Sequence, residues 1–450
     1  MIGNFCCEGN EARQILDYCA SRILLMPKPP GPLHRKAPTL WTWLGPGMVT
    51  GAADDDPSGI ATYSQAGAQL GPSILWTMPL TWPFMSAIQL VSSQIGRVTG
   101  RGLAANMRKF YGRRVALPLV LLLLVANIFN LGADISAMGA AAHLLFGGPV
   151  RVFAVGFTLV SVVSQVFIPY HRYANVLKWL TFVLFAYVGV MFFVQVPIGA
   201  VLAGTFIPLL GFDKTTITTF VAVLGTTISP YLFFWQSSQE VEEVRSHRYE
   251  HALLRHPEEA PRALTWLRRD TLVGMAFSNI VAYFIILATA VTLHANGITQ
   301  IDTADQAAQA LRPLAGNWCA LLFAIGILGT GLLAVPVLAG SAAFAVGEAL
   351  QFRTGLEHKP SRAKAFYGVL VFATLLGILL LYLKLNPIRA LYWSAVINGV
   401  ISAPIMIVVM LMASRPRIMG EFTIARIWRW LGWAATGLMA LAVLVFFATL

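Results

Sequence analysis

Two polar segments interrupt long apolar stretches of this chain, and both place oxygen-bearing side chains beside a proline. The first segment is Asp54–Gly59 and the second is Thr226–Tyr231. Proline has no backbone N–H and clashes with the preceding helical turn, so a regular helix is interrupted at each segment. Main-chain carbonyls freed at such breaks, together with a carboxylate, form the oxygen-rich environment that hard cations prefer. The spacing therefore predicts a cation site made by two broken helices.

Asp56 is the leading candidate ligand in the first segment. Pro57 disfavours helical geometry at Asp56, and Gly59 permits backbone conformations closed to other residues, so we include Gly59 in the candidate site. Successive helical residues point about 100° apart, so Asp54, Asp55 and Asp56 cannot face one point unless the helix unwinds before Asp54. Asp55 is a further candidate ligand. The alternative is that Asp54 and Asp55 are interfacial charges or partners of a basic residue.

The second segment offers neutral oxygens. Pro230 leaves the carbonyls around Thr226 and Thr227 without a helical donor, which makes Thr226 a candidate ligand. Ser229 and Tyr231 add hydroxyl oxygens and are candidates as well. The alternative for both hydroxyls is a hydrogen bond to a carbonyl of the preceding turn, which is common in membrane helices.

Polar residues also occur inside two other apolar stretches. Asn398 is a candidate cavity residue, or else a helix-packing residue. Asn127, Asn130 and Asp134 have i, i+3, i+7 spacing, which predicts a common helix face. A single acid on such a face is functional by default, for protons or for ion passage, unless a hydrogen-bond partner neutralises it.

The composition indicates a polytopic membrane protein. Of 450 residues, 57% are apolar and 12% are charged, and the apolar residues form runs long enough to cross a bilayer. We expect about eleven spans, over residues 44–70, 73–95, 115–146, 152–168, 174–196, 216–239, 271–293, 318–346, 365–385, 388–412 and 428–450.

The two breaks fall in the first and the sixth of these spans. Paired interruptions at equivalent positions of two halves are typical of inverted-repeat transporters. We predict a cytoplasmic tail over residues 1–40 and a transporter domain over 41–450, with one repeat at 44–196, a second at 216–412 and an additional helix at 428–450. The halves share no obvious residue-level similarity.

The positive charges are concentrated on one side of the membrane. The formal charge is +12, and 27 of the 32 lysines and arginines fall in the tail or in every second loop after the first span. This asymmetry predicts a cytoplasmic N-terminus and an external C-terminus, and it assigns the basic residues to anionic lipid rather than nucleic acid. The densely charged residues 240–270 predict a solvated cytoplasmic loop, in which we expect no metal role for the histidines.

From about Trp43 to Met412 the chain resembles the Nramp family of divalent metal transporters, whose first helix breaks at Asp-Pro-Gly-Asn and whose sixth breaks at Met-Pro-His. The resemblance rests on Gly45-Pro46-Gly47, on Asp56-Pro57 followed by Ile60-Ala61-Thr62, and on Gly139-Ala140-Ala141. It implies that Asp56 is the metal-binding aspartate, that Thr226 supplies a carbonyl ligand, and that Asn398 matches a polar residue near the metal.

Two departures from the family pattern concern the ligands. Ser58-Gly59 stands where the family has Gly-Asn, so an amide ligand is missing, and Ser229 stands where the family has methionine. A thioether is a soft ligand that favours transition metals, so its loss predicts a harder site. The combination resembles the Nramp-related magnesium transporters, and Mg²⁺ is usually held by one or two carboxylates while it keeps several waters.

Other departures concern protons. Tyr231 replaces the histidine that the family associates with proton transfer. Ala133 and Ser136 fall where the family has acidic residues, and Asp134 is displaced by one position. The resemblance therefore implies a transporter that is not proton-coupled.

We predict an all-α polytopic membrane protein with a LeuT-like inverted repeat of five plus five helices and one additional helix. It is expected to import Mg²⁺, and also Mn²⁺, by alternating access as a monomer in a bacterial inner membrane. The expected partners are the ion and the lipid bilayer, with no cofactor and no nucleic acid.

Three alternatives remain. The first is a proton-coupled Mn²⁺/Fe²⁺ transporter in which Asp134 handles the proton. The second is a sodium-coupled amino-acid transporter, disfavoured because the acidic patch would repel a substrate carboxylate. The third is a membrane-embedded enzyme, disfavoured because the spans contain neither a His-Glu-x-x-His motif nor paired Ser and His at helical spacing.

Overall fold

The computed structural model describes residues 45–168, 179, 182–208, 211–246, 251–379, 382 and 386–449. The predicted tail over 1–40 lies outside the described residues, as does part of the span predicted over 174–196. The described α-helices are α2 Pro46–Asp54, α3 Pro57–Leu70, α4 Thr77–Thr99, α5 Leu103–Tyr111, α6 Arg113–Phe146, α7 Val150–Phe167, α9 Ala186–Val190, α10 Ile198–Phe206, α11 Lys214–Thr227, α12 Pro230–Ser246, α13 Ala260–Thr292, α14 Ala304–Ala308, α15 Arg312–Ala315, α16 Cys319–Leu350, α17 Lys364–Leu379, α18 Pro387–Ala413, α19 Pro416–Met419 and α20 Arg426–Thr449.

Many of these helices are long enough to cross a bilayer. In the described part of the chain, seven helical segments have the length and hydropathy of a membrane span, and the pair of α3 and α4, bent by 116°, raises this to eight. α17 is a shorter apolar helix. Of the span predicted over 174–196, the described part is helical only over η3 (Phe182–Phe185) and α9. The total of eleven spans stays a prediction.

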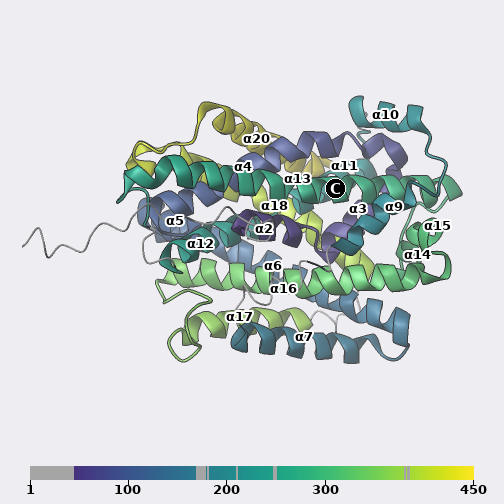
Figure 1. Ribbon diagram of the computed structural model, residues 1–450, viewed down its shortest axis with the longest axis horizontal. Helices are drawn as coiled ribbons and strands as arrows, with labels where there is room; N and C mark the ends of the chain where they lie inside the picture. The colour runs from purple at the N-terminus through teal and green to yellow at the C-terminus, as the bar shows by residue number, and fades with distance from the viewer. Residues whose placement is uncertain are drawn as a thin grey trace, which may run out of the picture. The chain divides into compact units, whose positions relative to one another are not determined.

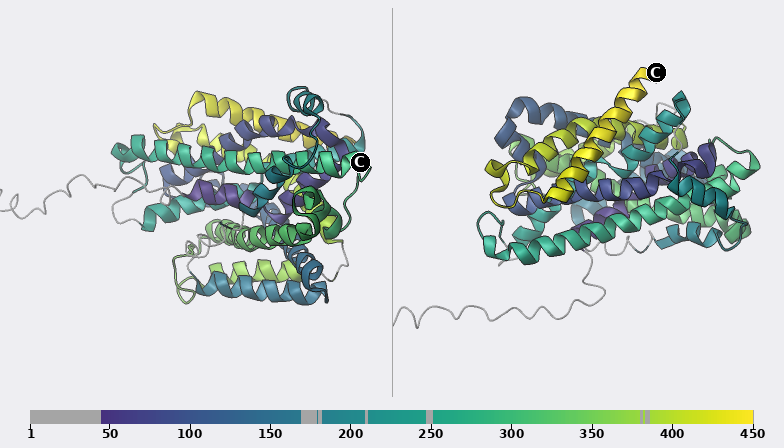
Figure 2. Two further views of the ribbon diagram at one scale, coloured as in Figure 1. Left: turned by 45° about the vertical axis from the view of Figure 1, so that its right-hand side comes forward. Right: turned by 90° about the horizontal axis from the view of Figure 1, so that it is seen from above.

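The broken helices lie inside the bundle. α2 and α3 pack against α13 on one side and α16 on the other, and Figure 1 shows them between these two long helices. α11 packs against α18, and α12 against α4 and α16. α7 and α17 lie side by side beyond α6 and α16, while α20 crosses α18 and α4 (Figures 1 and 2). The two breaks are therefore surrounded by protein, as irregular backbone in a membrane must be.

The start of α2 is held by a residue far away in sequence. The carboxylate of Asp270 in α13 accepts from the backbone N–H groups of Gly45 at 3.1 Å, Gly47 at 2.6 Å and Met48 at 3.3 Å. The first N–H groups of a helix have no helical acceptor, and a carboxylate there is also favoured by the helix dipole. Asp270 thus caps α2, whereas the sequence placed it at the end of a solvated loop.

Small residues let the broken helices approach their neighbours closely. A methyl group at Gly51 of α2 would lie 2.1 Å from the carbonyl oxygen of Gly274 in α13. A methyl group at Gly225 of α11 would lie 2.4 Å from the backbone nitrogen of Gly399 in α18. Contact between backbones is how membrane helices gain packing energy where no hydrophobic drive exists between them. These contacts fix both broken helices against unbroken ones.

Candidate functional site

The first polar segment breaks its helix, as predicted. α2 ends at Asp54 and α3 begins at Pro57, with Asp56 extended between them at φ −68° and ψ 170°. Proline suits the first position of a helix, where no backbone donor is needed. The expectation that Gly59 uses a backbone conformation closed to other residues is wrong. Gly59 lies inside α3 and is not among the glycines with positive φ. Asp56 and Pro57 are sufficient to make the break.

Three donors hold the buried carboxylate of Asp56. Its Oδ1 accepts from the backbone N–H of Gly59 at 2.6 Å, which makes Asp56 the N-cap of α3. Its Oδ2 accepts from Nδ2 of Asn130 at 3.1 Å and from the hydroxyl of Tyr231 at 3.2 Å. A carboxylate has about four lone-pair positions, and the backbone N–H of Ser58 also lies close to Asp56, so few positions remain for an ion.

Tyr231 links the two breaks. Its hydroxyl, on α12, lies 3.1 Å from the carbonyl oxygen of Ala53 and 3.2 Å from Oδ2 of Asp56. The Ala53 carbonyl lacks a helical donor because Pro57, four residues later, has no N–H. A tyrosine hydroxyl has one proton to donate, so these two acceptors compete for it. The structure places Tyr231 against Asp56, and its role as an ion ligand stays a prediction.

The second segment also breaks its helix, as predicted. α11 ends at Thr227 and α12 begins at Pro230. Since Pro230 has no N–H, the Thr226 carbonyl loses its helical donor and accepts from the Ser229 hydroxyl at 2.7 Å. The same hydroxyl lies 2.9 Å from the Gly225 carbonyl oxygen. In this structure Ser229 thus bonds to the preceding turn, which is the alternative given by the sequence.

The two breaks meet at Gly59. A methyl group at this position would lie 3.1 Å from the Asp54 carbonyl oxygen, 3.3 Å from the Thr226 hydroxyl oxygen and 3.4 Å from Oδ1 of Asp56. Oxygens of both broken helices therefore surround one point that no side chain occupies. The contribution of Gly59 is the room that its missing side chain leaves.

Asp54 and Asp55 contact a different helix from Asp56. The hydroxyl of Ser278 in α13 donates to Oδ2 of Asp54 at 2.5 Å and lies 3.1 Å from Oδ1 of Asp55. Asp54 is 1% exposed and Asp55 0%, so neither is an interfacial charge. Among the described residues no ion pair joins either to a basic side chain. The candidate ligand Asp55 is grouped with Asp54 and Ser278 rather than with the partners of Asp56.

Polar residues of α6 lie beside the first break. Asn130 donates to Asp56, and Asp134, one turn further on, is buried and close enough to Asp56 for an electrostatic interaction. Among the described residues neither carboxylate oxygen of Asp134 has a well-formed hydrogen bond, although the backbone N–H of Ser58 lies close to it. Asn127 instead donates to the Ser341 hydroxyl of α16 at 2.7 Å. The sequence predicted this polar face but did not identify Asn130 as the partner of Asp56. The available signal was that Asn130 lies one helical turn before the acidic Asp134.

Asn398 lies on α18 where this helix crosses α11. The neighbouring Gly399 contacts Gly225, the residue before Thr226, so Asn398 lies at the level of the second break. Its side chain is 2% exposed, and its Oδ1 has no hydrogen-bond partner among the described residues. A buried polar atom without a partner is costly, and an ion or its hydration water would satisfy it. Asn398 stays a candidate ligand.

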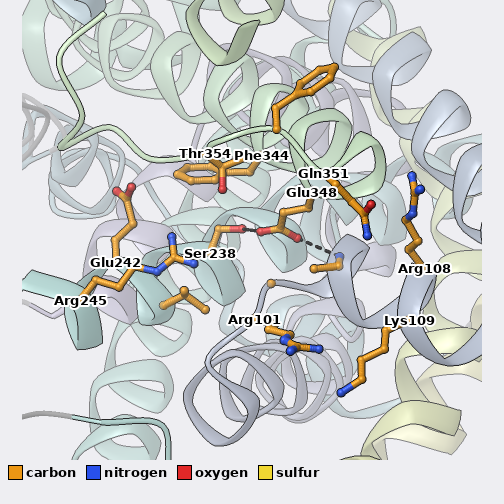
Figure 3. A pocket seen from close by; sticks show the side chains of 14 residues that line it. Arg101, Arg108, Lys109, Ser238, Glu242, Arg245, Phe344, Glu348, Gln351 and Thr354 are labelled. Carbon is orange, nitrogen blue, oxygen red and sulfur yellow. Dashed lines mark hydrogen bonds between the residues drawn. The ribbon is translucent and has the colours of Figure 1, made fainter. Parts of the chain in front are cut away.

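A separate cavity of about 510 Å³ lies between α5, α12 and α16. Arg101, Arg108, Lys109 and Arg245 line it around the carboxylate of Glu348, which accepts from the first turn of α5 (Figure 3). None of the residues of the two breaks lines this cavity. Its charged lining is mixed, since Glu242 lies there as well as Glu348, and we do not assign it to the cation site.

Two broken helices inside a bundle of apolar helices are typical of secondary transporters, which bind their substrates at such breaks. Solved structures agree on the fold. The manganese transporter of Eremococcus coleocola superposes with a TM-score of 0.73 at 16% identity, covering 92% of this chain and 87% of that one. MhsT, solved with L-phenylalanine, has a TM-score of 0.61 at 14% identity, covering 90% and 98%. The predicted all-α, LeuT-like fold is confirmed.

The family follows from the sequence comparison. Residues 47–449 match the family described as natural resistance-associated macrophage protein-like, Nramp, and the chain belongs to this family of membrane transporters. The relative named divalent metal cation transporter MntH, from Klebsiella pneumoniae, is 27% identical over 416 residues, covering 88% of this chain and 91% of its own. The protein with the same name from Mesorhizobium japonicum is 27% identical over 304 residues, covering 65% and 64%.

Proposed function

We propose that this chain imports divalent metal ions, Mg²⁺ and also Mn²⁺, by alternating access through the site where the two breaks meet. The relatives with the name divalent metal cation transporter support the ion class, and the solved manganese transporter with the same fold supports Mn²⁺. In one conformation of the bundle the buried Asp56 would be open to the outside, and in a second conformation it would be open to the cytoplasm.

The preference for Mg²⁺ rests on the oxygen atoms around Gly59. The Asp54 carbonyl, the Thr226 hydroxyl and the Asp56 carboxylate converge on this point, and both broken segments lack a thioether or an imidazole. Hard oxygen ligands suit Mg²⁺ and Mn²⁺ and offer nothing extra to soft ions. The donors around Asp56 leave few of its lone pairs for coordination, which fits an ion that keeps most of its water.

A second candidate is a proton-coupled transporter of Mn²⁺ or Fe²⁺. The observation in its favour is Asp134, whose buried carboxylate lies near Asp56 and has no well-formed hydrogen bond in the part of the chain that the structure describes. An acid in this position can exchange a proton when a dication reaches Asp56. We favour the uncoupled transporter because Tyr231 and Ala133 stand where the family has titratable side chains, and neither titrates near neutral pH.

The orientation and assembly are part of the same proposal. The positions of the basic residues support a cytoplasmic N-terminus and an external C-terminus, in a bacterial inner membrane. All of the candidate ligands come from one chain, which supports transport by a monomer.

The test is uptake by the purified chain in proteoliposomes that hold a metal-sensitive dye and a pH-sensitive dye. We expect uptake of Mg²⁺ and Mn²⁺ with no change of internal pH. Vesicles with the Asp56→Asn variant provide the background. Mn²⁺ uptake with acidification and without Mg²⁺ uptake would overturn the proposal in favour of the proton-coupled candidate.

A further inference from the structure

Three potential metal ligands come together in the loop between α12 and α13. His251, His256 and Glu259 each offer one ligand atom, and these atoms lie within 4.8 Å of one another. Nδ1 of His251 lies 3.8 Å from Oε1 of Glu259, and the two imidazole rings are 4.2 Å apart. From the sequence we predicted a solvated loop with no metal role for these histidines, because nothing in their spacing shows that the loop folds back on itself.

Backbone contacts hold the loop in this arrangement. The N–H groups of Leu253 and Leu254 donate to the carbonyls of Arg97 at 3.3 Å and Val98 at 3.1 Å, at the end of α4. The side chain of Leu253 is fully buried. His251 and His256 flank this attachment, so their approach to each other follows from a fixed turn of the chain.

The outer contacts are those expected around metal ligands. Nδ1 of His256 lies 2.9 Å from Oε1 of Glu258, and a proton on this nitrogen leaves Nε2 with a free lone pair. Metal-bound histidines typically hold a carboxylate in this way. Oε2 of Glu259 lies 3.4 Å from the backbone nitrogen of His251 and 3.9 Å from the guanidinium of Arg97, which leaves Oε1 toward His251.

One polar atom in the cluster makes no hydrogen bond to any residue that the structure describes. Nδ1 of His251 is shielded from solvent and makes no hydrogen bond among the described residues. A shielded nitrogen of this kind loses its water without gaining a bond, which is unfavourable unless a ligand supplies the bond. A metal ion between His251 and Glu259 would do so.

We propose that His251, His256 and Glu259 bind a divalent transition-metal ion, with Zn²⁺ as the strongest binder. Two imidazoles and one carboxylate with a water as fourth ligand form a known zinc geometry. Ligand atoms about 2 Å from zinc lie roughly 3.3 Å apart. The ligand nitrogens of the partly exposed histidines must therefore move inward by about 1 Å, which a rotation of the side chains allows. Imidazole is a poor ligand for Mg²⁺, so this site selects against the ion proposed for the breaks. It rests on the loop alone and does not depend on the proposed transport function.

The experiment is a Zn²⁺ titration by calorimetry of the detergent-purified full-length chain carrying Asp56→Asn, which removes the main ligand of the other site. We expect about one bound equivalent, lost when His256→Ala or His251→Ala is added. His358→Ala is the matched control, an exposed histidine of another loop, and should keep the equivalent. Mg²⁺ should give no binding at this site.

Glu258→Gln gives a second measurement that does not depend on removing a ligand. Glu258 is exposed and contacts His256 on the side away from the metal. Its substitution is expected to weaken Zn²⁺ binding about tenfold. Co²⁺ bound to the same protein should show visible absorption that disappears in His256→Ala. The proposal is overturned if the Asp56→Asn protein binds no Zn²⁺, or if its binding is the same with and without His251 and His256.

Discussion

The two helix breaks contribute different groups to the proposed ion site. At the first break Asp56 carries a negative charge, and its donors come from α3, α6 and α12. At the second break the side chains are neutral, and the freed Thr226 carbonyl is satisfied by Ser229 from the same segment. The charge is thus positioned by one local contact and two tertiary contacts, and the freed Thr226 carbonyl by a local contact alone. We infer that the first break decides whether a dication binds and the second decides which dication.

The two breaks also differ in how their freed carbonyls would respond to movement of a helix. Pro57 frees the Ala53 carbonyl and Pro230 frees the Thr226 carbonyl, yet only the first is satisfied by a side chain of the other break, Tyr231. Any movement of α12 away from α2 therefore exposes Ala53 and releases one donor from Asp56 together. Such a shared contact is the kind of two-state element that alternating access requires.

The largest expected effect is at the first break. Asp56→Asn removes the charge but keeps a good N-cap, so the fold should be preserved while Mg²⁺ uptake into proteoliposomes falls roughly a hundredfold or more, as for a buried ion that loses its charged partner. Asp55→Asn should have a smaller effect, since Asp55 contacts Ser278. The matched control is Asp302→Asn, at an exposed ion pair with Arg389. Equal uptake by the Asp56 and Asp302 variants would exclude the site.

A change at the second break should alter selectivity rather than abolish binding. Ser229→Met replaces a hard oxygen by a soft sulfur, and we expect the affinity for Cd²⁺ to rise about tenfold, or ~1.4 kcal/mol. Calorimetric titration measures it, with thermal unfolding to check that the buried methionine is tolerated. Ser361→Met, at an exposed serine of the loop before α17, serves as control. No gain in a folded variant would contradict the division of roles between the breaks.

The smallest effect is expected at the contact between the breaks. Tyr231→Phe removes one of three donors to Asp56, and Gly59 and Asn130 remain, so Mg²⁺ affinity should change only about threefold, corresponding to ~0.6 kcal/mol. Tyr382→Phe, at an exposed tyrosine, is the control. A loss as large as that of Asp56→Asn would show that Tyr231 itself coordinates the ion.

Much of the fold could be predicted because its causes are local. Hydropathy marked most of the helices, and Pro57 and Pro230 marked both breaks, since a missing N–H acts within one turn. The error at Gly59 arose because the sequence suggested backbone freedom, while the structure uses the absence of a side chain at a point where two helices meet. A close approach of this kind is a property of two segments, and one segment cannot reveal it.

The amino-acid sequence by itself determined that two proline-containing breaks would free carbonyls near a carboxylate inside a membrane protein. Only the tertiary structure decided the hydrogen-bond partners of the groups near these breaks. They are Asn130 and Tyr231 for Asp56, Ser278 for Asp54 and Asp55, and Asp270 for the start of α2. The physical reason is range, because a broken helix follows from neighbouring residues, whereas a buried charge must be satisfied by donors from distant segments that only packing brings within hydrogen-bond distance.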